Sequence, residues 1–209
     1  MRASFLMVAA LVALTRGVEA QGPWGNVKSW TGSVTIEVVD SRKGEAMSSE
    51  MKYTATGGFT ISDDMLPDGS HVMWPMPGAE AMSDPQKMAA ATDAWQSHVV
   101  ATFQATVPNE SGGAPATVTC SADNKAASQV ALTINPTAPT YVLQVAAPKP
   151  LFKCTGATHG VNPPVSIQPP TFKLTGARGA PGAVSGTQTF TVGTSIIKVT
   201  YNMAPSKKS

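Results

Sequence analysis

In residues 34–39, VTIEVV, apolar and polar side chains alternate and most residues are β-branched. This period of two is typical of a strand with one face buried and the other face in water. The same alternation returns in residues 52–61, KYTATGGFTI. These two segments therefore predict antiparallel β-structure with a polar outer face.

Alternating segments recur along the whole chain, and glycine- and proline-rich turns separate them. Nine are expected: residues 34–39, 52–61, 99–107, 116–120, 129–134, 141–145, 171–174, 187–192 and 195–201. This pattern predicts an all-β fold, a β-sandwich or partly open barrel of roughly 8–10 short strands. Proline- and glycine-rich loops are expected at 110–115 and 146–183, because proline cannot donate to a strand ladder.

One segment has helical rather than strand periodicity. Residues 83–86, SDPQ, have the spacing of a capping box, with serine followed by glutamine three positions later. Met88 and Trp95 then fall on one helical face. We expect one short helix near 84–97, with Met88 and Trp95 closing an end of the sandwich.

Residues 1–20 have the organisation of a secretory signal peptide. Arg2 precedes an apolar run at 5–14, and residues 18–20, VEA, suit cleavage before Gln21. We expect a single domain at 21–209, secreted or periplasmic. No later apolar stretch is long enough for a transmembrane helix, so the chain is not expected to span a membrane.

The chain has two cysteines, Cys120 and Cys154, and each closes a strand-like segment. In an oxidising compartment such a pair is most simply one structural disulfide. Redox chemistry usually uses a Cys-x-x-Cys motif, and structural zinc uses four ligands. Neither pattern occurs here.

Charge is divided unevenly along the chain. Residues 21–123 carry 12 acidic and five basic groups, whereas residues 124–209 carry eight basic groups and no acid. Two halves interleaved in one sandwich would neutralise each other, whereas a basic face would bind an anionic partner. The basic residues are scattered and few aromatic residues lie among them, so nucleic-acid binding is not expected.

One cluster suggests soft-metal chemistry. Imidazole and thioether ligands such as His71, Met73 and Met76 select Cu(I) or Ag(I), and a neighbouring tryptophan, Trp74, can cover the cation with its ring face. In residue type these four resemble the site of small periplasmic copper/silver chaperones with β-barrel folds. Methionines that fill gaps in a core beneath a proline-rich loop would give the same pattern.

The sequence lacks the motifs of catalytic serine elbows and zinc helices. We therefore expect a non-catalytic binding or structural protein without a cofactor, whose ligand is carbohydrate or another envelope or extracellular protein. Candidate stacking residues are Trp24, Trp30 and Trp74. Two alternatives remain open: a Cu(I)/Ag(I)-binding protein that uses the cluster above, and a secreted glycan hydrolase whose carboxylates precede residue 124.

Overall fold

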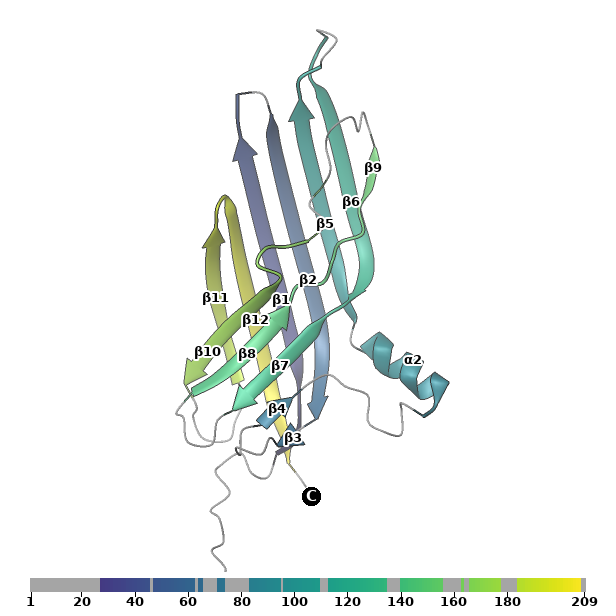
Figure 1. Cartoon of the computed structure of the whole chain (residues 1–209), viewed down its shortest axis with the longest axis vertical. Coiled ribbons are helices and arrows are strands. Elements are labelled where there is room, and N and C mark those ends of the chain that lie inside the picture. The colour runs from purple at the N-terminus through teal and green to yellow at the C-terminus, as the bar shows by residue number, and fades with distance from the viewer. Residues whose placement is uncertain are drawn as a thin grey trace, which may run out of the picture.

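A computed structural model describes residues 27–45, 47–62, 64–65, 71–73, 83–94, 96–109, 113–134, 140–155, 163, 166–177 and 184–207. Twelve strands and one helix lie in this part of the chain (Figure 1). They are β1 Val27–Lys43, β2 Ser48–Ser62, β3 Asp64–Met65, β4 His71–Met73, α2 Pro85–Ala94, β5 Gln96–Val107, β6 Ala116–Ala127, β7 Gln129–Ile134, β8 Thr140–Ala146, β9 Lys153–Thr155, β10 Thr171–Ala177, β11 Val184–Val192 and β12 Ser195–Lys207.

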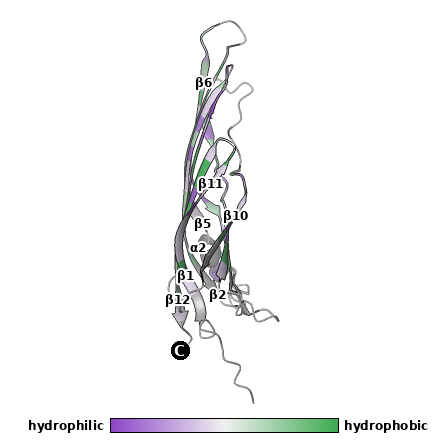
Figure 2. Cartoon of the chain, turned by 90° about the vertical axis from the view of Figure 1, so that its left-hand side faces the viewer, coloured by the Kyte–Doolittle hydropathy of each residue, from purple (hydrophilic) through white to green (hydrophobic). Residues whose placement is uncertain are grey.

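The strands form two sheets, which confirms the predicted all-β, sandwich-like class. A large sheet has seven strands in the order β11-β12-β1-β2-β5-β6-β9, and a small sheet has five in the order β10-β8-β7-β4-β3. Every pairing is antiparallel. The small sheet covers only part of the large one, and edge-on the molecule is long and thin (Figure 2).

All nine expected strands are present, and most are longer than predicted. The first extends over 17 residues and the second over 15. In the first strand the alternation of inward and outward side chains continues beyond both predicted ends. Trp30 and Asp40 both point inward, although Asp40 is polar. Three strands beyond the nine expected, β3, β4 and β9, have only two or three residues each. β9 includes Cys154, where the sequence indicated the end of a strand-like segment.

The predicted helix is shorter than expected and its cap differs. Asp84, rather than Ser83, is the N-cap: its carboxylate accepts hydrogen bonds from the backbone N–H groups of Gln86 at 2.9 Å and Lys87 at 3.4 Å. Residues 85–90 are exposed, and Met88 is 38% exposed. The expectation that Met88 closes an end of the sandwich is therefore wrong, and the side chain of Trp95 lies outside the described residues.

The core lies between the inner face of the large sheet and a second layer, which consists of the small sheet and the segment 147–152. The small sheet contributes fully buried side chains from three strands, Leu132, Leu143 and Leu174. Beyond the small sheet, the segment 147–152 crosses the inner face of the large one. Its two prolines, Pro148 and Pro150, are buried, so part of the predicted surface loop 146–183 belongs to the core layer.

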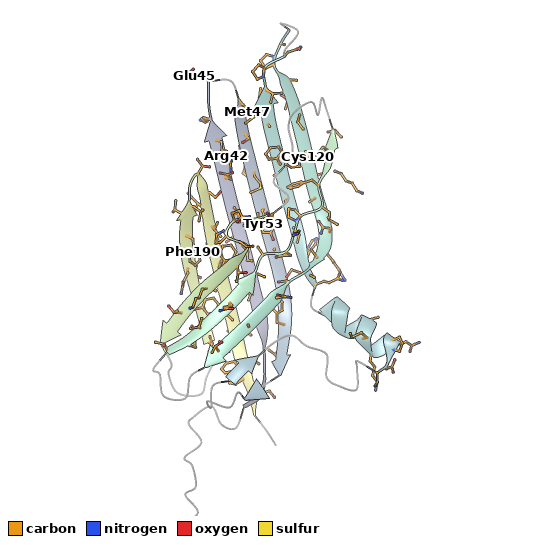
Figure 3. The ribbon with its side chains drawn as sticks, in the orientation of Figure 1. Arg42, Glu45, Met47, Tyr53, Cys120 and Phe190 are labelled. Carbon is orange, nitrogen blue, oxygen red and sulfur yellow. A yellow bond between two sulfur atoms is a disulfide. The ribbon has the colours of Figure 1, made fainter. Side chains whose placement is uncertain are left out.

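Three contacts hold this segment in place. The buried Tyr53 hydroxyl donates to the Pro148 carbonyl at 2.8 Å, and the ring of Phe152 packs edge-on against Phe103. The predicted Cys120–Cys154 disulfide is present and joins β6 to β9, where the two residues face each other with Cα atoms 4.0 Å apart. Figure 3 shows Tyr53 near the middle of the large sheet and Cys120 on β6.

Two tyrosines connect the sheets below this segment. Tyr141 on β8 and Tyr201 on β12 meet edge to face, with hydroxyl oxygens 2.9 Å apart. Each ring lies over a glycine on the neighbouring strand, Tyr141 over Gly176 and Tyr201 over Gly186. A Cβ at either glycine would overlap the ring, so the absence of a side chain there permits the contact between sheets.

Replacing Gly176 with alanine should therefore destabilise the sandwich. A methyl group would overlap the ring of Tyr141, and overpacking of this kind costs about 1–3 kcal/mol of the free energy of unfolding. Gly58→Ala is the matched control, because Gly58 lies on the exposed face of β2 and a methyl group there would be 3.8 Å from its nearest neighbour. Urea unfolding would measure both, and equal stability of the two variants would contradict this account.

Candidate functional site

The outward side chains of the large sheet are exposed or half-exposed along most of its length. They alternate with the buried side chains on β11, β12, β1, β2, β5 and β6. Most are threonine, serine or charged residues. We call this surface the outer face.

Four threonines on the outer face lie in one row that crosses four strands. Thr187 pairs with Thr200, Thr200 with Thr35, and Thr35 with Thr56. The hydroxyl oxygens are 3.2 Å apart in the first pair and 3.4 Å apart in the last. Neighbouring strands are about 4.8 Å apart, so this threonine row is about 14 Å long.

The threonine row offers ordered hydrogen-bonding groups to a ligand. Each hydroxyl has one donor and two acceptor positions, so a bond to its neighbour leaves further capacity. The β-branched side chain has few rotamers, which lowers the entropy lost when a ligand binds. The row can therefore bind an array of hydroxyl or amide groups.

Several charged or ionisable side chains on the outer face lie in close pairs. Lys198 donates to Glu37 at 2.8 Å, Lys52 is 2.9 Å from Glu50, and a ring nitrogen of His98 is 2.7 Å from Asp123. All these side chains are about half exposed or more, so each pair contributes little to stability. The Glu37–Lys198 pair joins the acidic and basic halves of the chain, as interleaving of the two halves predicts.

A second polar cluster lies at the turn between β11 and β12 and has a structural role. Gly193 has a φ of 59°, which favours glycine, and Thr194 beside it donates to the carboxylate of Asp40. Arg42 also donates to Asp40 at 3.0 Å. Since Asp40 is buried and both contacts are internal, this cluster anchors the turn to β1.

Two hollows in the described surface are small. One, of about 160 Å³, lies at the far end of the β1–β2 hairpin near Arg42 and Ser49; Figure 3 shows Arg42, Glu45 and Met47 at this end. The other, of about 190 Å³, lies along β7 and β8 near Gln129 and Gln144. Sites for small molecules usually have about 300–1,000 Å³, so neither hollow suits such a ligand.

Of the three predicted stacking residues, the structure describes only Trp30. Trp30 is fully buried on the inner face of β1, so it cannot stack on a ligand. Trp24 and Trp74 lie outside the described residues. The rings of Tyr53, Phe59, Phe103 and Tyr201 on the large sheet are buried as well, and Phe190 on β11 is half-buried.

The predicted soft-metal cluster stays a prediction. His71 and Met73 lie two positions apart on β4, where they pair with Ile134 and Leu132 of β7. Their side chains and the whole of Met76 lie outside the described residues. Within the described part of the chain, no three histidine, cysteine, aspartate or glutamate side chains gather as metal ligands would.

The carboxylates of the outer face are too far apart for glycoside cleavage. Glu37 and Asp123 belong to one cross-strand row but are three strands apart, about 14 Å. Glu50 lies on the adjacent strand and four residues along from Glu37's partner, a similar separation. Glycosidases place their two carboxyl groups about 5–9.5 Å apart, so these residues give no support to the hydrolase alternative.

The threonine row was not predicted from the sequence, although a signal for it exists. Each threonine lies in a predicted strand, at the polar phase of the alternation. The register between strands that are far apart in sequence brings them into one row, and that register follows from the fold. Only a correct pairing of the last strand with the first would have revealed the row.

Comparison with known proteins gives no family or function. No protein-family model, curated protein or solved structure matches this chain. None of the described helices is long and apolar enough to cross a membrane. Function therefore has to be argued from the residues themselves.

Two buried tyrosines make stability sensitive to alkaline pH. Burial raises the pKa of Tyr53, and burial together with the hydrogen bond to Tyr201 raises the pKa of Tyr141. In the unfolded chain tyrosine loses its proton near pH 10. The unfolded state would then release protons that the folded state retains, which favours unfolding.

The contribution of these two tyrosines to the free energy of unfolding should thus be nearly constant below about pH 9 and should fall above about pH 10. In Tyr53→Phe the fall should be shallower, because one of the shifted groups is absent. Denaturant unfolding between pH 7 and pH 11 would measure this pH dependence, with Tyr→Phe variants compared at each pH. An identical slope in wild type and variant would contradict the assignment.

Proposed function

We propose that this chain is a non-catalytic binding protein, secreted or periplasmic, whose outer face binds a hydroxyl-rich polymer such as an envelope or matrix polysaccharide. The observation that carries the proposal is the threonine row, with its ordered hydroxyls in register across four strands. The ion pair of Glu37 and Lys198 lies one row away on the same face and adds charged hydrogen-bonding groups.

A polymer fits the surface better than a small molecule does. The outer face is long and uncovered, whereas the hollows of the described surface are too small to enclose a ligand. Hydrogen bonds to exposed hydroxyls are individually weak, and a polymer compensates because successive units bind at high effective concentration. Binding without aromatic stacking should be weak for each sugar unit.

The extracytoplasmic compartment is supported by two independent features. The first is the signal-peptide pattern of residues 1–20. The second is the disulfide between Cys120 and Cys154, since such bonds persist mainly outside reducing compartments.

Protein recovered from the periplasm or medium should begin at Gln21 and contain no free thiol. Intact-mass analysis with thiol labelling would measure both, and an intact Met1 or two reactive cysteines would contradict the assignment.

The binding proposal can be tested by removing hydroxyls without changing side-chain shape. Thr35→Val with Thr200→Val removes two adjacent hydroxyls of the threonine row while keeping the β-branched side chains. Two lost hydrogen bonds of about 0.5–1.5 kcal/mol each should weaken polymer binding by about 5- to 150-fold. Retention on a panel of insoluble polysaccharides, followed by titration with the polymer that binds, would measure the loss.

The matched control is Thr106→Val with Thr117→Val. These threonines also face each other on neighbouring strands of the large sheet, at its opposite end. Their replacement with valine should leave polymer binding unchanged. Equal losses in both double variants would remove the threonine row as the site, and no retention on any polymer in the panel would overturn the proposed ligand class.

A further inference from the structure

The edge of the large sheet at β11 is unlike the other sheet edges. It is a nine-residue strand, VSGTQTFTV, with no charged residue and no proline. Within the described residues its only strand partner is β12. Long uncharged edges readily accept another strand, and proteins usually protect them with charge, proline or short length.

The other three edges have such protection. The opposite edge of the large sheet, β9, has three residues, includes Lys153 and is fixed by the disulfide. In the small sheet, β3 has two residues. The β10 edge carries Lys173, and its Thr175 carbonyl accepts a hydrogen bond from the Gln188 side chain at 2.9 Å.

Burial also indicates that, among the described residues, the inner side of β11 is less covered than that of β12. On β12, the inward side chains of Ile197 and Val199 are fully buried. On β11, the inward residues Gln188 and Phe190 are only half-buried, and Val192 is 42% exposed. Phe190 packs on Phe172 at one side, with ring centroids 5.7 Å apart, and lies at the sheet edge (Figure 3).

We propose that β11 pairs with β11 of a second copy of this chain, antiparallel and centred on Gln188. The sequence of the strand is self-complementary in that register: Thr187 faces Thr189 of the second copy, Ser185 faces Thr191, Gly186 faces Phe190 and Val184 faces Val192. Hydroxyls therefore meet hydroxyls on the outer side. On the inner side the two Gln188 amides meet at the centre, and apolar groups meet apolar groups or glycine on either side of them. No like charges oppose each other, so the pairing carries no electrostatic penalty.

The assembly would close at two copies. A two-fold axis uses the same edge of both chains, and the remaining edges are short or charged. The two large sheets would join into one continuous sheet, and the outer faces would lie side by side. The inference does not depend on the proposed polymer, because strand pairing can be measured without any ligand.

Sedimentation equilibrium of the purified chain tests the pairing. A nine-residue strand edge is a small interface, so we expect a reversible dimer with a dissociation constant in the roughly micromolar range. Thr189→Lys places two positive charges near the two-fold axis and should raise that constant at least tenfold. Thr54→Lys, which adds the same charge to the central strand β2, is the matched control and should leave it unchanged.

A charge-reversal mixture tests the register as well. Thr189→Glu alone should be monomeric like Thr189→Lys, and an equimolar mixture of the two should dimerise again. Circular dichroism of each variant would show that the fold is intact. A wild-type chain that stays monomeric at about 200 μM, equal effects of Thr54→Lys and Thr189→Lys, or a mixture that does not dimerise would overturn the proposal.

Discussion

The inner face of the large sheet has to be shielded from water over a greater length than the small sheet can cover. The first strand of the large sheet has 17 residues, whereas β8, an interior strand of the small sheet, has seven. Apolar side chains beyond the small sheet, such as Met51 and Phe103, are nevertheless buried. The segment 147–152 covers part of that remainder, and the disulfide next to it ties the segment to β6.

The spacing between the two layers depends on two glycines, Gly176 and Gly186. Tyr141 and Tyr201 reach each other because each ring lies over a glycine of the next strand. Their hydroxyls form a hydrogen bond in a buried place, where an unpaired hydroxyl would cost about 1–3 kcal/mol. The same burial raises the pKa of Tyr141, so this contact accounts for the layer spacing and, together with the buried Tyr53, for the expected sensitivity to alkali.

Burial on one side of the large sheet leaves the other side free for recognition. Because alternate residues point to opposite faces, every strand that contributes a core residue also contributes an outward one. Antiparallel register then aligns outward residues of strands distant in sequence, which is how Thr35 comes to lie between Thr200 and Thr56. The outer face and the open edge at β11 are adjoining parts of one sheet, so pairing at the edge would extend the face.

The sequence by itself determined the class of fold, the nine main strands and the cysteine pair, because alternation and cysteine number are local properties. It did not reveal that Trp30 is buried, because the expected first strand began only at residue 34, although Trp30 lies in phase with the inward Val34 and Ile36. The proline-rich segment 147–152 was expected in a loop at a sheet edge or on the surface, because proline cannot donate to a strand ladder. Its burial depends on the length of the large sheet relative to the small one. The threonine row and the unprotected edge were decided by tertiary structure alone, since both depend on which strands become neighbours and which strand is left at the end.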